Sequence, residues 1–286
     1  FFIDKARELG AGFFATGHYC RKEETDVDGR KVFRLLAGTD PNKDQSYFLC
    51  QLSQDQLSQA LFPIGHMMKP EVREIARKLD LASAAKKDSQ GICFVGKVDL
   101  PTFLQQKLKT KKGKIIEIPA SVIPKQDLPD SPDQEKLKAL CSDHDYNPGQ
   151  GRVMGSHNGA YFYTIGQRKG LNVGGTPEPL FVISTDIENN IIYVGQGKEH
   201  PGLYRRGLFI AKNEIHWIRP DQQLKEGTSA GYGVRIRYRQ SIQEATLYMK
   251  ADGLYIVFNK LQRGITSGQF AAWYEGEELL GSGVIQ

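Results

Sequence analysis

The sequence lacks any uninterrupted apolar segment of about 18 residues or more, the length that a membrane-spanning helix needs. It contains only four cysteines, Cys20, Cys50, Cys93 and Cys141, and no two of them are spaced as C-x-x-C. These absences exclude a membrane-spanning protein and leave no disulfide framework or zinc site that spacing would reveal. Neither sign of charge dominates, because 38 basic and 33 acidic side chains leave a net charge of +5, which permits a polyanionic partner without requiring one. We therefore expect a cytoplasmic protein with reduced thiols and no metal site.

The 286 residues suffice for about two domains, and three small ones are possible. The first hundred residues have the pattern of an α/β fold. Residues 13–16 form a predicted buried strand, and residues 32–36 form another. Ser53 and Gln56 have the spacing of a capping box that opens a helix. Pro70 begins an amphipathic helix, because the apolar residues after it follow the 3.6-residue period.

The pattern changes after the first hundred residues. A basic run occupies 107–114, and a polar stretch follows at 124–154, where we predict a short helix capped by Ser131 with Pro132 at its first position. From Tyr161 onward, short strands separated by glycine and asparagine turns indicate small antiparallel sheets or a closed barrel. The predicted strands are 115–118, 180–184, 191–194, 208–211, 245–249, 254–258 and 270–274.

Two positions in the α/β region are candidates for chemistry. Cys93 follows a Ser-Gln-Gly turn, where an exposed thiolate could act as a nucleophile or sulfur carrier. The same cysteine lies between Ile92 and Phe94, and the spacing alone favours a buried core position, because free cysteine is among the most buried residue types. Gly17 and His18 follow a predicted strand, where a glycine lets a nucleotide approach the backbone and a histidine can contact a phosphate. A simple turn with a hydrogen-bonded histidine explains the pair as well.

Two polar segments are candidates for contact with a nucleic acid. Residues 43–45, Lys-Asp-Gln, follow a turn and either face a nucleic acid or form a solvated loop. Residues 234–240 alternate apolar and basic side chains, so in a strand Arg235, Arg237 and Arg239 would share one face at about 7 Å spacing. That stripe suits a phosphate backbone, and it equally suits a solvated outer sheet face. Aromatic side chains beside basic ones at 161–170 suit stacking on RNA.

Five motifs occur in an order that resembles one known family. They are ATGHY at 15–19, KDQSYFL at 43–49, DSQGICFVG at 88–96, YTIGQRKGL at 163–171 and RIRYRQ at 235–240. Together they resemble the tRNA-specific 2-thiouridylases over nearly the whole chain. The resemblance implies an α/β plus β fold. Its parts would be the remainder of a PP-loop, Rossmann-like ATP pyrophosphatase domain at 1–98, a small central tRNA-binding domain at 99–204 with an insertion near 124–154, and a C-terminal antiparallel β-barrel at 205–286.

The resemblance also implies a reaction. Members of this family place sulfur at C2 of the wobble uridine of tRNAs for Lys, Glu and Gln. ATP, with Mg²⁺, activates the C2 oxygen by adenylation, and a cysteine persulfide then delivers the sulfur. The implied partners are tRNA and a sulfur donor, either a sulfur-relay protein or a cysteine desulfurase. The implied site residues are Cys93 as the persulfide carrier, Gly17 as an ATP contact, and His18, Lys43, Asp44, Gln45, Arg237, Tyr238 and Gln269 as tRNA contacts.

The sequence departs from the family pattern in two ways. The phosphate-holding PP-loop, of the form SGGVDSS, does not occur in it. The second catalytic cysteine, which pairs with the persulfide cysteine, is also absent, since neither Cys20, Cys50 nor Cys141 lies where it should. We expect both to lie upstream of Phe1, and we expect the chain by itself to be inactive in thiolation. The other departure is the polar stretch at 124–154.

Two other functions remain open. One is a tRNA-binding protein of the same lineage without catalysis, which the missing PP-loop favours. The other is a cysteine-dependent redox enzyme unrelated to tRNA, which would need neither the arginines at 235–239 nor the lysines at 107–114. An older label of methyltransferase for this family has no support in the residues, because no methyl-donor site is evident and sulfur chemistry accounts for Cys93.

Overall fold

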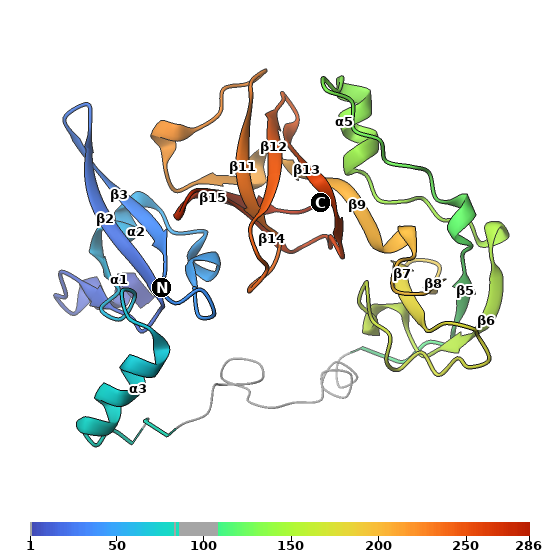
Figure 1. Ribbon diagram of the computed structural model, residues 1–286, viewed down its shortest axis with the longest axis horizontal. Coiled ribbons are helices and arrows are strands. Elements are labelled where there is room, and N and C mark those ends of the chain that lie inside the picture. The colour runs from blue at the N-terminus through green and yellow to red at the C-terminus, as the bar shows by residue number, and fades with distance from the viewer. Residues whose placement is uncertain (1, 83, 86–107) are drawn as a thin grey trace. The chain divides into compact units, whose positions relative to one another are not determined.

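The computed structural model of the chain describes residues 2–82, 84–85 and 108–286. The chain divides into two compact units (Figure 1). Unit one contains Phe1–Lys86, Leu208–Lys260 and Ser267–Gln286, and unit two contains Lys87–Gly207 and Leu261–Thr266. None of the helices in the described part is long and apolar enough to cross a membrane.

Unit one begins with the predicted α/β pattern. Strand β1 (Phe14–Ala15) pairs in parallel with β4 (Ala60–Leu61), so both strands end at the same edge. Along the chain, the helix α1 (Phe2–Glu8) precedes β1, α2 (Gln54–Gln59) directly precedes β4, and α3 (Lys69–Lys78) follows β4.

Local sequence signals account for where α2 and α3 begin. Ser53 caps α2 with the predicted capping box, since its hydroxyl accepts from the N–H of Gln56 while the Gln56 side chain accepts from the N–H of Ser53. Pro70 lies in the first turn of α3, and the Glu71 side chain accepts from the N–H of Met68 at 2.7 Å. Both helix predictions are confirmed.

A large sheet holds most of the rest of unit one. Its order is β2-β3-β15-β14-β11-β12-β13-β9, with β10 paired to β15. The pairs from β2 to β13, and the pair β10–β15, are antiparallel. The strands are β2 Cys20–Val27, β3 Arg30–Ala37, β9 Tyr204–Ala211, β10 Ile215–Trp217, β11 Ser229–Arg235, β12 Gln243–Met249, β13 Gly253–Arg263, β14 Phe270–Glu275 and β15 Glu278–Val284.

The hairpin β2–β3 joins the two ends of the chain. Asp28 and Gly29 turn it with positive φ angles of 52° and 76°, the backbone that a tight two-residue hairpin turn requires. Strand β3 pairs with β15 through Leu35 and Leu36, so a segment that the sequence assigned to the α/β region extends the C-terminal sheet. The core of unit one contains Cys20, Leu35, Cys50, Leu57, Ile218, Ala272, Tyr274 and Leu279.

Unit two contains a four-stranded sheet of order β6-β5-β8-β7, in which only the central pair β5–β8 is parallel. The strands are β5 Gly113–Glu117, β6 Arg152–His157, β7 Leu180–Asp186 and β8 Ile191–Gln196. The predicted turn between β7 and β8 is present, and Asn190 adopts a φ of 55° in it.

The polar stretch at 124–154 contains one α-helix, α5 (Gln134–Cys141), which lies in unit two. Its cap is Asp133, whose carboxylate accepts from the N–H of Lys136 at 2.7 Å. The prediction of a helix here is confirmed, and the predicted cap at Ser131 is wrong. The helix begins two residues later because Asp133 supplies the acceptor that the first turn needs.

Candidate nucleic-acid interface

Three predicted segments, 17–19, 43–49 and 235–240, lie together in unit one with the predicted contact Gln269. The first element that shapes them is the loop before the short 3-10 helix Ser46–Leu49. Asp40 is 4% exposed, and its carboxylate accepts from the N–H groups of Asn42 and Lys69, both at 3.0 Å. Its carbonyl accepts from the N–H of Lys43 at 2.9 Å. The buried carboxylate therefore fixes the backbone from which Lys43 projects.

Asp44 faces inward. Its side chain is 3% exposed, accepts from the N–H groups of Gly38 and Ser46, each at 3.1 Å, and forms an ion pair with Arg235. The Arg235 guanidinium also lies 5.1 Å from the centroid of the Tyr274 ring. Asp44 therefore ties the 43–48 segment to the end of β11 and presents little surface to a ligand.

Gln45 connects the 43–48 segment to the predicted nucleotide-binding turn. Its side-chain oxygen accepts from the N–H of Tyr19 at 3.0 Å, and its own N–H donates to the Tyr19 carbonyl at 2.9 Å. His18 is half-buried, and its Nδ1 lies 2.9 Å from the hydroxyl of Thr16. Burial lowers the pKa of His18, so the imidazole is neutral near pH 7. Gly17 beside it is exposed.

The predicted stripe of three arginines is wrong. Strand β11 ends at Arg235, and residues 236–239 form a bend and turn in which Arg239 adopts a φ of 64°. The side-chain oxygen of Gln240 accepts from the N–H of Ile236 at 2.9 Å, which stabilises the turn. Arg235 thus points to Asp44, while Arg237 and Arg239 are exposed.

Tyr47 connects the loop to the last predicted contact. Its hydroxyl donates to the carbonyl of Phe270 at 2.8 Å, next to the exposed Gln269. Burial raises the pKa of Tyr47 to about 12, and the positive charge of Arg237 acts in the opposite direction. Phe48 and Tyr238 also meet, with ring centroids 4.4 Å apart.

The resulting surface is basic. The segments 43–49 and 235–240 carry four basic side chains and one acidic one, a net charge of +3. The acidic one, Asp44, pairs with Arg235, while Arg237 and Arg239 are exposed and Lys43 is half-buried. Such a surface attracts phosphates, and the attraction weakens as salt concentration rises.

Cys93 lies outside the described residues. The other cysteines, Cys20, Cys50 and Cys141, are all free and at most 3% exposed. Burial raises the pKa of the Cys20 thiol far above its ordinary value and also raises the pKa of Cys50. Neither thiol is therefore suited to act as a nucleophile at neutral pH.

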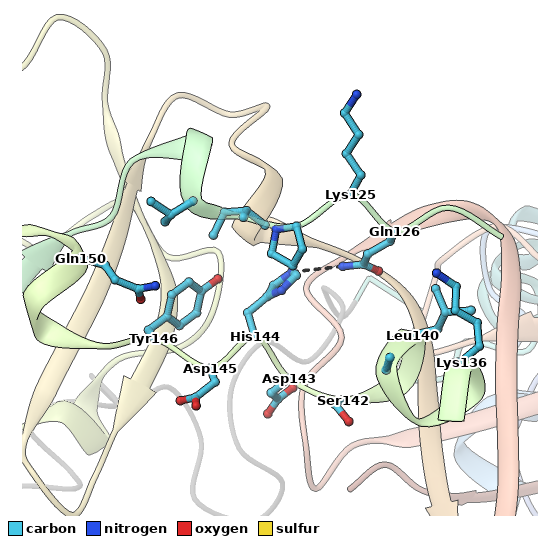
Figure 2. Close-up of a pocket in the computed structure, with 14 residues that line it drawn as sticks. Lys125, Gln126, Lys136, Leu140, Ser142, Asp143, His144, Asp145, Tyr146 and Gln150 are labelled. Carbon is cyan, nitrogen blue, oxygen red and sulfur yellow. Dashed lines mark hydrogen bonds between the residues drawn. The ribbon is translucent and has the colours of Figure 1, made fainter. Parts of the chain in front are cut away.

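The polar stretch at 124–154 contributes a pocket in unit two that the sequence analysis missed (Figure 2). The pocket has a volume of about 330 Å³ and lies between α5 and the segments around Gln126 and His144. The side-chain nitrogen of Gln126 lies 3.1 Å from His144 Nε2, and burial lowers the pKa of His144. The buried hydroxyl of Tyr146 has no hydrogen-bond partner among the described residues. The run Ser-Asp-His-Asp-Tyr at 142–146 is the sequence signal that could have indicated this pocket. None of the predicted site residues lines this pocket.

Comparison with family models places the chain in a class of multi-domain proteins, two of whose matched domains carry the description tRNA methyl transferase. Residues 1–97 match the family model "tRNA methyl transferase HUP domain", residues 145–196 match "tRNA methyl transferase PRC-barrel domain", and residues 207–285 match "Aminomethyltransferase beta-barrel domain". An α/β HUP domain followed by β-rich domains agrees with the fold class that the sequence predicted, which is confirmed. The three-domain boundaries at 98/99 and 204/205 remain a prediction.

The particular family follows from the relatives. The chain is 54% identical to a tRNA-specific 2-thiouridylase MnmA of Christiangramia forsetii and 55% identical to one of Flavobacterium johnsoniae. Each alignment covers 99% of this chain and 72% of the relative. A third, of Halalkalibacterium halodurans, is 42% identical over 99% of this chain and 66% of the relative. The chain belongs to the tRNA-specific 2-thiouridylase family.

Proposed function

We propose that this chain recognises tRNA for the ATP-dependent 2-thiolation of the wobble uridine in tRNAs for Lys, Glu and Gln. The observation that carries the proposal is the convergence of the segments around His18, Lys43, Arg237 and Gln269 on one basic surface of unit one. The names of the relatives, tRNA-specific 2-thiouridylases, support tRNA as the polyanion and thiolation as the reaction. We place this reaction in the cytoplasm.

The residues on this surface divide into contacts and positioning residues. Lys43 and Arg237 supply charge for phosphates, and the neutral His18, with Tyr238 and Gln269, supplies uncharged contacts. Asp44 acts from behind the surface, because its buried carboxylate holds the loop and Arg235 in place. Gln45 joins the loop to the turn that carries His18, so its side chain also positions its neighbours.

The sulfur chemistry is assigned to Cys93. The C2 oxygen of uridine is a poor leaving group, and transfer of AMP from ATP to this oxygen, with release of pyrophosphate, makes it a good one. A sulfur-relay protein or a cysteine desulfurase loads Cys93 with a persulfide, whose terminal sulfur attacks C2 and displaces AMP. A second cysteine thiolate then attacks Sγ of Cys93, which leaves the sulfur on uridine and forms a disulfide. The burial of Cys20, Cys50 and Cys141 argues against any of them in this second role.

The residues present fit only part of an ATP site. Gly17 follows β1 at the carboxyl edge of a parallel pair, where α/β sheets bind ligands. A Cβ on Gly17 would meet only the Ile64 side chain, at 4.0 Å, so the edge is open. The phosphate-binding SGGVDSS pattern does not occur in the sequence. No group of three His, Cys, Asp or Glu side chains in the described part could hold Mg²⁺. We therefore derive no step through Mg²⁺, and we propose that the chain alone does not thiolate tRNA.

Equilibrium binding of unmodified tRNA over a range of salt concentrations tests the recognition. Arg237→Ala and Lys43→Ala should each weaken binding and reduce the slope of log K against log salt by about one unit, since each removes one phosphate contact. Lys31→Ala is the control, because Lys31 is 72% exposed near the hairpin turn, about 20 Å along β2–β3 from the Cys20–Ala37 end. Unchanged affinity and slope in both test variants would refute the interface.

A non-catalytic tRNA-binding protein of the same lineage is a second candidate, and the absence of the SGGVDSS pattern favours it. The genomic sequence on the 5′ side of the codon for Phe1 distinguishes the two. An in-frame PP-loop there supports the thiolation enzyme, whereas its absence supports the binding protein. Robust sulfur incorporation into tRNA by residues 1–286, with ATP and sulfide, would refute the proposal that the chain alone is inactive.

A further inference from the structure

Phe48 is an aromatic side chain that the structure keeps at the surface. It is 55% exposed, although it lies in a short 3-10 helix whose other members are anchored. Ser46 is buried and lies 3.2 Å from the hydroxyl of Tyr274, and the hydroxyl of Tyr47 donates to Phe270. Because hydrogen bonds hold the side chains of Ser46 and Tyr47, Phe48 has a defined position on the outside of the loop.

Among the described residues, the Phe48 ring stacks on one other aromatic ring. The Tyr238 ring lies with its centroid 4.4 Å away at an interplanar angle of 37°, while Tyr47 meets Phe48 at its edge, 6.2 Å away and at 68°. A ring that is packed on one face and still 55% exposed has its opposite face open to solvent. Burial of an aromatic ring is favourable, so an ordered ring left half open invites a ligand.

The charges around Phe48 select the kind of ligand. The Arg239 guanidinium lies 5.1 Å from the Tyr238 ring centroid, and Lys43 and Arg237 belong to the two segments that the Asp44–Arg235 pair and the Phe48–Tyr238 contact join. A protein partner would need an apolar area larger than one ring. An open aromatic face whose supporting ring carries a cation beside it matches a nucleotide instead, whose base stacks while its phosphate meets a basic side chain.

We propose that Phe48, supported from behind by Tyr238, is a stacking platform for one unpaired nucleobase of the bound RNA. The inference rests on the proposed function, because it assigns a new contact within the same tRNA interface. It gives Tyr238 a second task besides its own contact with tRNA, which is to hold the Phe48 ring, and it adds an uncharged source of affinity to the phosphate contacts of Lys43 and Arg237.

The test measures tRNA binding by the full chain as a function of salt, with the Phe48→Ala and Phe48→Trp variants. Phe48→Ala should weaken binding at least about fivefold, because a stacked base is lost, and leave the salt slope unchanged, because no phosphate contact is lost. Phe48→Trp should retain the affinity, since indole offers a larger stacking face. Phe13→Ala is the matched control, because Phe13 is 63% exposed and lies at the opposite end of β1 from Gly17, so its loss should change nothing. A perfectly paired RNA duplex should bind equally well to the unmodified chain and to Phe48→Ala.

The possible outcomes separate the platform from the proposed function. If Phe48→Ala binds tRNA as the unmodified chain does while Arg237→Ala binds more weakly, the interface stands and the platform is refuted. If Phe48→Ala and Phe48→Trp both have a lower melting temperature and a lower affinity than the unmodified chain, Phe48 is a structural residue and the platform is refuted. If the unmodified chain does not bind tRNA, the proposed function fails and the platform fails with it.

Discussion

The carboxylate of Asp44 and the guanidinium of Arg235 form a buried ion pair between residues 191 positions apart in the sequence. Asp44 also accepts from two backbone N–H groups, so its charge is compensated on three sides. The pair joins the loop that carries Lys43 to the turn that carries Arg237. The geometry of the basic surface therefore depends on two residues that are themselves poorly accessible.

Removing one partner of this pair should be costly. Asp44→Ala leaves the Arg235 charge and the N–H groups of Gly38 and Ser46 without their acceptor, and we expect it to lower the free energy of unfolding by about 3–5 kcal/mol. Asp44→Asn keeps an acceptor oxygen and should cost less. Urea unfolding followed by tryptophan fluorescence reports this, because both Trp217 and Trp273 lie in unit one.

An exposed ion pair in the same unit provides the control for Asp44. The pair between Arg21 and Glu277 has side chains 27% and 71% exposed, so Glu277→Gln should cost less than about 1 kcal/mol. Comparable losses for Asp44→Ala and Glu277→Gln would show that burial does not strengthen the Asp44–Arg235 pair.

The sequence predicted elements whose signals are local. The capping box at Ser53, the amphipathic pattern after Pro70 and the strand patterns of the C-terminal region all arise from neighbouring residues. Strand β2 was missed because its residues, Cys20–Val27, are mostly charged and show no apolar alternation. The Asp28-Gly29 turn was the available signal for that hairpin. The second strand of the hairpin, β3, pairs with β15, and this pairing joins residues more than 240 positions apart, which no local pattern encodes.

The candidate site was predicted as separate segments, and the structure shows how they are connected. The alternation at 234–240 favoured a continuous strand, but Gln240 accepts from the N–H of Ile236 and Arg239 adopts a positive φ, so the strand ends at Arg235. The partner that turns Arg235 inward is Asp44, which is distant in sequence. Residue type, spacing and the family resemblance therefore gave candidate contacts, and they could not show that Arg235 faces inward while Arg237 and Arg239 are exposed.

The cap of α5 can be tested with two neighbouring residues. Asp133→Ala removes the acceptor for the N–H of Lys136 and should destabilise the helix by about 1 kcal/mol. Ser131→Ala, at the position that the sequence pattern suggested, should change almost nothing. Hydrogen exchange of the Leu137 amide measures both, because this N–H donates to the carbonyl of Asp133 within the first turn. Faster exchange in Ser131→Ala than in Asp133→Ala would contradict the observed cap.

Persulfide formation on Cys93 can be measured without the thiolation reaction. We expect the chain, incubated with a cysteine desulfurase and cysteine, to gain one sulfur atom on Cys93, as detected by mass spectrometry of alkylated peptides. Cys93→Ser should abolish the gain, because a hydroxyl cannot carry a persulfide. Cys20→Ser, Cys50→Ser and Cys141→Ser should retain it, because these thiols are buried and the pKa of both Cys20 and Cys50 is raised. Loading that persists in Cys93→Ser would refute the catalytic assignment.

His200 should make the stability of unit two depend on pH. The side chain is 5% exposed, its Nδ1 accepts from the N–H of Gly202 at 3.2 Å, and its Nε2 lies 3.0 Å from the carbonyl of Ile118. Since Nδ1 is an acceptor, the ring is neutral with its proton on Nε2, which donates to Ile118. Burial is the main cause that lowers the pKa of His200 below its ordinary value. Gly195 lies against the ring, where an added Cβ would come within 2.4 Å.

The sign of the pH effect follows from these contacts. A histidine whose pKa is lowered by folding binds its proton first in the unfolded state, so its contribution to stability is complete above about pH 6.5 and is lost as the pH falls toward the folded-state pKa. We expect the Gly202 amide to exchange faster, relative to its intrinsic rate, as the pH falls below this value. His200→Gln keeps one donor and one acceptor but does not titrate, so it should reduce this dependence while lowering the protection at pH 7. The amide is the necessary reporter, because both tryptophans lie in unit one. An equal pH dependence in the unmodified chain and in His200→Gln would show that the proton is taken up elsewhere, at His144 or His157, whose pKa values burial also lowers.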